Sequence, residues 1–499
     1  MVSGLSAHIG KVLRVDLTVG RIWEEKLDEA SLRMYVGGTG LGSKFLYDEV
    51  KPGTEWDDPE NRLILASGPL SGAKVAGSGS YSVVTKGPLT NGATSTQANG
   101  YFGAYLKFCG FDAVIIQGKA NTWKYLYIHD GIAELSDATN LVGKDTWETE
   151  SQIKKELGMN RRGLSVVGIG PAGENLVRFA AIVGDEGHVA AHNGVGAVMG
   201  SKKLKAVAAA RGRAELKFYD AQKVLALGRQ MIEDVKKHET YKMLFNWGNS
   251  HLYPIYAAIG VLPVKNMTTN LFPEAEKFSA EYYRPRSEVK NNPCWACPSH
   301  HCSIIKITEG PYAGYEAEEP EYECWAAFSS LIGQADLGAA LMLNDVTDRL
   351  GMDGNETGWL LAFTMECFEK GIITQKDTDG LLMNWGNVGA AREMLFHIAK
   401  REGFGNILAE GVMRAAQTIG GEALNCAVYM KKGHAPRGHD HRARWGEILD
   451  YAVSGTGTIE TGPILGLDQF SPDSVALTLA SEKSRFFVDS LVMCMFPTM

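Results

Sequence analysis

The sequence contains the glycine-rich run Gly77-Ser-Gly-Ser-Tyr-Ser-Val-Val-Thr-Lys-Gly-Pro-Leu-Thr90, one of several that interrupt roughly the first 210 residues. Glycine accounts for 57 of the 499 residues, well above its usual share of about 7%. This excess indicates tight turns and close approach of the backbone to a bound group. Leu13, Val15 and Leu17 alternate with polar neighbours, as in a half-buried strand. Further predicted strands are 63–66, 113–117, 125–128, 164–167 and 206–210.

Beyond about residue 215 the apolar residues recur at helical spacing. Gly351 and Gly371 directly follow two predicted helices, 337–350 and 357–370, where a glycine commonly forms the C-terminal cap. The pattern therefore predicts a β-rich base followed by helical domains. Predicted helices are 39–50 and 147–157 in the first part, then 221–237, 337–350, 357–370, 390–401 and 405–419.

Composition excludes several classes of protein. The net charge is −8 without a prominent basic run, which argues against nucleic-acid binding. No stretch of about 18 apolar residues occurs, so we expect no membrane span. The first residues lack a signal-peptide pattern, and we expect a cytoplasmic protein of two or three domains.

The segment Cys294-Trp-Ala-Cys297-Pro-Ser-His-His-Cys302 groups three of the eight cysteines within nine residues. In a large cytoplasmic chain such a group indicates metal binding rather than disulfides. Three thiolates supply most of the shell of an iron–sulfur cluster. Zinc is a second reading, because His300 or His301 could complete its site, and three incidental buried cysteines are a third.

Gly168-Ile-Gly170-Pro-Ala-Gly173 follows a predicted strand and satisfies the dinucleotide-binding pattern. The flanking segments do not alternate strand and helix regularly, and Pro171 lies inside the loop. We therefore interpret the match as a structural turn rather than a nicotinamide or flavin site.

Four glycine-rich segments, in order, resemble the pterin-facing segments of the aldehyde:ferredoxin oxidoreductase family. They are the run from Gly77, Asn99-Gly-Tyr-Phe-Gly103, Gly168 to Val177, and Gly194-Val-Gly-Ala-Val-Met-Gly-Ser-Lys202. The resemblance covers about Gly10 to Cys494 and implies a bis-pterin cofactor of tungsten or molybdenum. It implies an α+β fold with a β-rich, two-sheet pterin-binding domain at 1–212 and a helical domain at 213–420. A second helical domain would begin at 421–499, and since Cys494 lies so near Met499 we expect more protein to follow.

The resemblance assigns Cys294, Cys297, Cys302 and Cys494 to a 4Fe–4S cluster, although four residues separate Cys297 from Cys302 where the aldehyde enzymes have three. Two aspartate motifs, Asp348-Arg-Leu-Gly351-Met-Asp353 and Asp489-Ser-Leu-Val492-Met-Cys494, would each accept hydrogen bonds from a pterin. Val492 departs from the glycine of the second motif.

The resemblance also implies a Mg²⁺ ion bridging the pterin phosphates, near Gln97. Ser80 and His192 replace arginines of the family that contact phosphate, so recognition would use backbone N–H groups and Lys86. The cofactor-binding residues implied in this way are Gly79, Ser80, Lys86, Gln97, Asn99, Gly100, His192, Asn193, Gly194, Asp348, Gly351, Asp353, Asp489 and Met493.

The segment Glu319-Pro-Glu321-Tyr-Glu323-Cys324-Trp325 places a cysteine where the aldehyde enzymes have alanine or a small hydroxyl residue. Cys324 resembles the tungsten-ligating cysteine of the class II benzoyl-CoA reductases, and a thiolate suits a metal held by sulfur. The alternative to metal ligation is that Cys324 is a small buried hydrophobic residue, as free cysteines commonly are. On this basis we expect reduction of the benzoyl-CoA ring to a cyclohexadienoyl-CoA.

Ring reduction needs a proton donor, for which histidine is the usual group. We expect this donor to be His251, with His434, His439 and His441 as the other candidates. The alternative function is oxidation of aldehydes, with Glu321 or Glu323 as acid or base, and a third is a non-catalytic electron carrier. The family further implies a ferredoxin-like electron-transfer subunit and an oligomer. It is also compatible with assembly into a larger membrane-associated complex.

Overall fold

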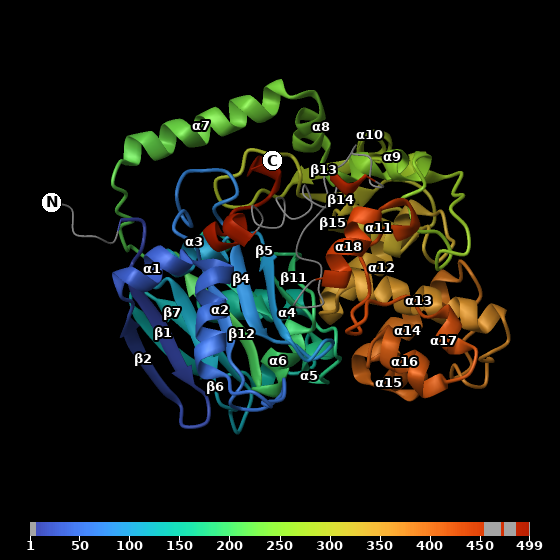
Figure 1. Ribbon diagram of the computed structural model, residues 1–499, viewed down its shortest axis with the longest axis horizontal. Helices are drawn as coiled ribbons and strands as arrows, with labels where there is room; N and C mark the ends of the chain where they lie inside the picture. The colour runs from blue at the N-terminus through green and yellow to red at the C-terminus, as the bar shows by residue number, and fades with distance from the viewer. Residues whose placement is uncertain (1–5, 454–470, 474–485, 499) are drawn as a thin grey trace.

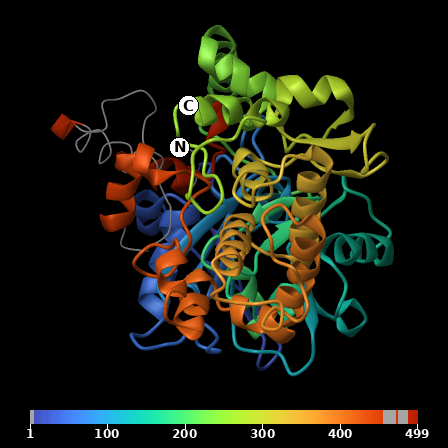
Figure 2. The same ribbon diagram turned by 90° about the vertical axis from the view of Figure 1, so that its right-hand side faces the viewer.

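The computed structural model describes residues 6–453, 471–473 and 486–498. A β-rich half lies beside a helical half, and the long helix α7 (Ala221–Lys237) crosses above the β-rich half (Figure 1). After a quarter turn the helical half faces the viewer, in front of the β-rich half (Figure 2). In the part of the chain that the structure describes, no helix is long and apolar enough to cross a membrane.

The first sheet has six strands in the order β2-β1-β6-β3-β4-β5. Only β1 and β6 are parallel neighbours; the other pairs are antiparallel. Helix α2 packs on β3 and β4, so β3 is buried along its whole length. The strands are β1 Lys11–Asp16, β2 Arg21–Lys26, β3 Leu63–Ala66, β4 Tyr81–Lys86, β5 Ala93–Ala98 and β6 Ala113–Gln117, and the helices are α1 Glu29–Tyr35, α2 Gly38–Glu49 and α3 Phe102–Phe108.

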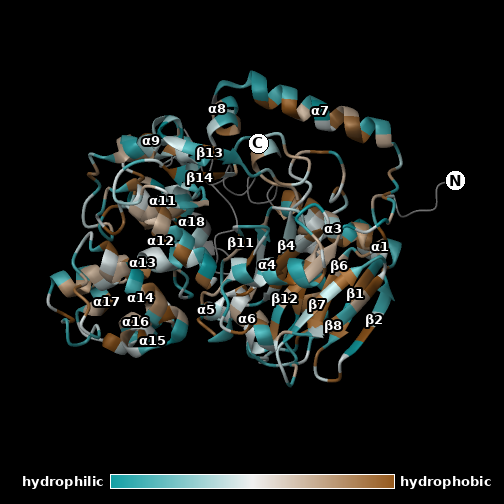
Figure 3. Ribbon diagram, turned by 180° about the vertical axis from the view of Figure 1, so that it is seen from behind, coloured by the Kyte–Doolittle hydropathy of each residue, from teal (hydrophilic) through white to brown (hydrophobic). Residues whose placement is uncertain are grey.

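The second sheet has the order β11-β10-β9-β12-β7-β8. Helix α4 starts with a reciprocal capping box between Asp145 and Glu148 and packs on β9. The strands are β7 Lys124–His129, β8 Ile132–Asp137, β9 Leu164–Gly168, β10 Ile182–Gly184, β11 His188–Ala190 and β12 Leu204–Ala210, and the helices are α4 Thr146–Glu156, α5 Pro171–Glu174 and α6 Val195–Ser201. The apolar strands of both sheets lie inside this half (Figure 3).

The helical half is built around α12 and α13, which are buried over most of their length. A small sheet, β13-β14-β15, lies beside it. The helical half and this small sheet together comprise the elements α8 Glu239–Trp247, α9 Leu252–Ala258, α10 Ala280–Tyr283, β13 Ser287–Asn291, β14 Ser303–Ile307, β15 Glu316–Glu318, α11 Tyr322–Ala327, α12 Leu337–Leu350, α13 Gly354–Glu369, α14 Val388–Lys400, α15 Gly403–Leu408, α16 Val412–Ile419, α17 Ala423–Cys426 and α18 Trp445–Val453.

Several glycines lack the Cβ that would keep apart two segments distant in the sequence, and so allow these segments to pack closely. A Cβ at Gly38 would lie 2.2 Å from Val492 Cγ2, and one at Gly68 would lie 1.9 Å from the Leu491 carbonyl. The segment 489–494 therefore packs directly on the glycine turns of the first sheet. Gly170 similarly abuts the carbonyl of Leu350 at the end of α12. Because β9 is antiparallel to both neighbours, this loop is no dinucleotide-binding βαβ unit.

The α+β class and every predicted strand are confirmed, with bounds that differ by at most a few residues. Gly351 ends α12 in a left-handed conformation, as expected of a C-cap. The single helix predicted over 405–419 is wrong. The segment forms α15 and α16, which are separated at Gly411, where φ is +87°. The division into three domains stays a prediction.

Candidate functional site

The cysteines that the sequence assigned to a cluster converge between the two halves. The loop of Cys294 and Cys297 lies on the first sheet, where the Trp295 amide donates to the Gly100 carbonyl at 3.0 Å. A Cβ at Gly79 would lie 2.7 Å from Trp295 Cβ, so only glycine permits this approach. Cys494 reaches the same place, because its amide donates to the Gly77 carbonyl at 3.0 Å.

The thiols of Cys294 and Cys302 form one group with an imidazole that the sequence analysis missed. Ligand atoms of His188, Cys294 and Cys302 all lie within 4.8 Å of one another, and His188 Nε2 is 3.6 Å from Cys294 Sγ. A hydrogen bond with Cys302 and the nearby His188 lower the pKa of Cys294 well below its usual value. Burial opposes the charge on His188, but the Cys294 thiolate and Glu318 raise its pKa to about 10. A lone histidine on a short edge strand gives no sequence signal for this role.

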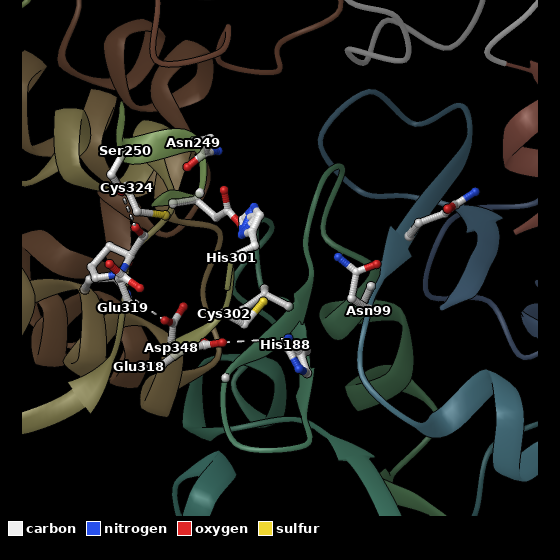
Figure 4. Close-up of a pocket in the computed structure, with 18 residues that line it drawn as sticks. Asn99, His188, Asn249, Ser250, His301, Cys302, Glu318, Glu319, Cys324 and Asp348 are labelled. Atoms are coloured by element: carbon white, nitrogen blue, oxygen red, sulfur yellow. Dashed lines mark hydrogen bonds and ion pairs between the residues drawn. The ribbon is translucent and has the colours of Figure 1, made fainter. Parts of the chain in front are cut away.

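A cavity of about 160 Å³ opens beside this group, between the two halves of the molecule (Figure 4). The sheets contribute Asn99 and His188, and the helical half contributes Cys324 from α11 and Asp348 from α12. Its complete lining is Gln97, Ala98, Asn99, Gly187, His188, Val189, Gly248, Asn249, Ser250, His301, Cys302, Glu318, Glu319, Pro320, Glu321, Cys324, Asn344 and Asp348. Asn249, Ser250, Glu318, Glu319 and Asn344 are lining residues that the sequence analysis did not single out, and His301 was considered there only as a possible zinc ligand.

Carboxyl groups crowd this cavity. Burial raises the pKa of Glu318 to about 7 and raises the pKa of Glu321 and of Asp348 well above the usual range. Glu319 is paired with Arg284, which donates to both of its oxygens at 2.7 and 2.6 Å. Buried carboxyl groups without a cation are costly, so the cavity suits a cationic or donor-rich group.

Cys324 points into the cavity from the first turn of α11 (Figure 4). The turn is held by Asn249, whose Oδ1 accepts from the Tyr322 amide at 2.8 Å. A Cβ at Gly354 would lie 2.9 Å from Cys324 Sγ, so α13 starts directly behind the thiol. Burial raises the pKa of Cys324 well above its usual value, and a bound metal ion would remove the proton.

Of the residues assigned to the pterins, Gln97, Asn99 and Asp348 line the same cavity. Ser80 Oγ donates to Asn99 Oδ1 at 2.7 Å, and Gln97 Nε2 donates to the Asp489 carbonyl at 3.0 Å. Asp348 accepts from Asn344 at 2.8 Å. The Oδ1 atom of Asn344 is buried and has no hydrogen-bond partner among the described residues. Gly100 contacts the cysteine loop, and Gly351 caps α12.

Other assigned residues lie elsewhere. Lys86 Nζ donates to the Thr54 carbonyl, and Met493 is buried in an apolar cluster with Val75. Val492 has φ +56°, the left-handed conformation for which a glycine is favoured. His192, Asn193 and Gly194 form the turn before α6, and His192 faces Asp353 at the start of α13.

The candidate proton donors separate into three places. His251 pairs with Glu281 and does not line the cavity. His434 is buried beside Asp353, whereas His439 and His441 surround Glu447 at 2.9 and 3.2 Å. His301 lines the cavity beside Cys302, with Nε2 3.0 Å from Glu321 Oε1. Glu323 packs against Gly438 behind the cavity.

Comparisons with known proteins agree with this arrangement. Residues 12–211 match the aldehyde ferredoxin oxidoreductase N-terminal domain, and residues 226–499 match domains 2 and 3. The tungsten-containing aldehyde ferredoxin oxidoreductase of Pyrococcus furiosus is 37% identical over 98% of this chain and 82% of its own length. The aliphatic sulfonate oxidoreductase WOR-like subunit of the same organism is 33% identical over 99% and 80%.

Among solved structures, the active-site complex of benzoyl coenzyme A reductase with 1,5-dienoyl-CoA contains a similar chain. The TM-score is 0.83 at 26% identity, covering 98% of this chain and 82% of that chain. The convergent thiols, the buried acceptors and the two family segments together show that this chain is an oxidoreductase that belongs to the aldehyde ferredoxin oxidoreductase family.

Proposed function

We propose that the chain oxidises aldehydes to carboxylic acids and passes the electrons to a ferredoxin-like carrier. The observation that carries this proposal is the comparison itself. Four tungsten-containing aldehyde ferredoxin oxidoreductases are 35–37% identical over 98% of the chain, against 26% for the benzoyl coenzyme A reductase chain. The sequence had favoured ring reduction and kept aldehyde oxidation as the alternative, and the comparisons favour the alternative.

The residues around the cavity fit a tungsten–bis-pterin group beside a 4Fe–4S cluster. Cys294, Cys297, Cys302 and Cys494 would hold the cluster, because four thiolates are its usual shell. Asp348 and Asp489 would accept the N–H groups of the pterins, and the partnerless Asn344 Oδ1 adds a third acceptor. Gln97 and Asn99 would lie near a Mg²⁺ ion that bridges the pterin phosphates. When bound, the tungsten centre supplies two-electron chemistry, and the cluster passes single electrons to the partner.

Oxidation of an aldehyde to an acid consumes one water and releases two electrons and two protons. Glu321 is placed to accept a proton, because it lines the cavity and its Oε1 lies 3.0 Å from His301 Nε2. Burial, together with the neighbouring Glu323 and Glu318 carboxyl groups, raises the pKa of Glu321 well above its usual value, so this carboxylate binds a proton more readily than a free one. His301 would pass the proton onward, since burial lowers its pKa to about 4 and keeps the imidazole neutral.

Reduction of an aromatic thioester is the second candidate, and Cys324 is the observation that favours it. The thiol faces the cavity where a sulfur-bound metal would lie. Cys324 would hold a sulfur-bound metal in this cavity, and the metal would supply the electrons for ring reduction.

Two assays on anaerobically purified, tungsten-replete protein decide between the functions. We expect oxidation of short aldehydes with a viologen acceptor and no reduction of benzoyl-CoA. Cys324→Ala should retain tungsten and most aldehyde activity. Because Cys426 is buried outside the cavity, Cys426→Ala is the matched control. Benzoyl-CoA reduction that disappears with tungsten in Cys324→Ala would overturn the proposal in favour of the second candidate.

A further inference from the structure

We propose that His188 is a positioning residue of the iron–sulfur cluster, which donates a hydrogen bond from Nε2 to Sγ of Cys294 and thereby raises the reduction potential of the cluster. Nε2 lies 3.6 Å from that sulfur. Ligand atoms of His188, Cys294 and Cys302 also lie within 4.8 Å of one another. The inference rests on the cluster that the proposed function assigns to the four cysteines. It goes beyond that function by naming a side chain that controls how readily the cluster accepts an electron.

The chemistry of the two groups fixes the direction of this hydrogen bond. An iron-bound cysteine is a thiolate, which accepts hydrogen bonds and has no proton to donate. Nε2 of His188 must therefore carry the proton. The imidazole is buried, with only 6% of the residue exposed. A hydrogen bond in such a low-dielectric place is electrostatically stronger than one in water.

The β10–β11 hairpin holds the imidazole in place by itself. The turn residues 185–187 have φ values of +48°, +63° and +119°, all in the left-handed half of the backbone map. Asp185 anchors this turn, because its Oδ2 accepts from the Tyr101 amide at 2.7 Å and from the Ser165 hydroxyl at 2.9 Å. Strained turns persist only where the surroundings fix them. His188 follows the turn directly, and so its position is fixed as well.

A glycine lets the ring approach the cysteine loop. A Cβ at Gly100 would lie 2.9 Å from Cδ2 of His188, so any other residue there would press on the imidazole. The carbonyl of the same glycine accepts from the Trp295 amide at 3.0 Å. One residue of the first sheet therefore contacts both the imidazole and the loop of Cys294, and the contact between the two does not depend on a flexible side chain.

The imidazole stands between the cluster thiol and the cavity. Its Nδ1 faces Oε1 of Glu318 at 3.7 Å, and Glu318 lines the cavity (Figure 4). Hydrogen bonds to the sulfurs of a cluster help to set its potential. They stabilise the reduced state more than the oxidised one, because the reduced state carries one more negative charge. A higher potential makes the cluster a better acceptor for electrons that leave the cavity.

The same distances allow an alternative, in which His188 itself ligates iron. Cys494 favours the hydrogen bond, because its amide donates to the Gly77 carbonyl and a fourth thiol thus reaches the loop. Histidine ligands also raise the potential of iron–sulfur clusters. The potential alone therefore does not separate the two roles, and the iron content must be measured beside it.

The test is an anaerobic redox titration of the iron-replete protein, followed by EPR of the reduced cluster. At a fixed potential, His188→Leu should lower the ratio of reduced to oxidised cluster at least tenfold, which corresponds to a midpoint about 59 mV lower. His188→Gln keeps an N–H donor and should recover much of this shift. His129→Leu is the matched control, because His129 pairs with Glu134 on the β7–β8 hairpin and does not line the cavity. It should leave the midpoint unchanged.

We expect His188→Leu to retain about four irons per chain. An unchanged midpoint in this variant would overturn the proposal, and so would loss of iron from the folded variant, which would make His188 a ligand. If the variant fails to fold, pulsed EPR of the unaltered chain labelled with ¹⁵N-histidine decides. A weakly coupled nitrogen supports the hydrogen bond, whereas no coupling, or the strong coupling of an iron-bound imidazole, contradicts it.

These measurements use no substrate, so their failure leaves the proposed function standing. A lowered midpoint in His188→Leu, together with no aldehyde oxidation by the unaltered protein, would count against the proposed function alone.

Discussion

At the scale of single residues, Glu321 is the side chain whose titration should govern turnover. Its pKa is raised well above the usual value by burial, so the basic form gains population only as the pH rises through that shifted value. We expect kcat/KM for aldehyde to increase with pH along a limb above about pH 4.5. Glu321→Gln should remove the limb and reduce activity by about 10²–10⁴-fold.

The control is Glu316→Gln, which changes an exposed glutamate on β15 outside the cavity. This variant should keep both the rate and the profile. A limb that persists near pH 7 in Glu321→Gln would assign the titrating group to Glu318 instead, since burial raises the pKa of Glu318 to about 7.

At the scale of elements, the start of α2 should tolerate no side chain at Gly38. A Cβ there would lie 2.2 Å from Val492 Cγ2 and 2.5 Å from the Asp489 carbonyl, at φ +41°. We expect Gly38→Ala to lower the free energy of unfolding by about 1–3 kcal/mol beyond the backbone strain. Gly20→Ala is the matched control, because φ is +66° and nothing lies within 4 Å. Equal losses in chemical denaturation would show that segment 489–494 does not press on α2.

The elements also show what sequence can predict. Strands such as β3 and β6 follow from local apolar patterns, and α7 was predicted with its observed bounds. The break at Gly411 was missed because apolar periodicity continues across it. In the site, the cysteines and Asp348 were found through motifs in order. His188 and Asn344 were not, because their roles arise only when distant segments meet, and His301 was considered only as a zinc ligand.

At the scale of the whole molecule, the cavity joins the two halves. Asn99 and His188 come from the sheets, while Cys324 and Asp348 come from α11 and α12. A group that binds residues of both halves stabilises only the folded arrangement. Binding at a thousand times the dissociation constant adds about 4.1 kcal/mol. We therefore expect tungsten-replete protein to unfold several degrees above protein produced without tungsten.

Scanning calorimetry under anaerobic conditions would measure this difference, with iron content matched so that only the tungsten group varies. Without the group, segment 489–494 still contacts the first sheet, and Thr146 still donates a hydrogen bond to the Asp348 carbonyl in the helical half. Those contacts keep the fold, whereas the bound group adds ligands on both sides of the cavity. Equal midpoints for the two preparations would show that the tungsten group adds no stability to the folded arrangement of the two halves, and that the cavity between them is not its site.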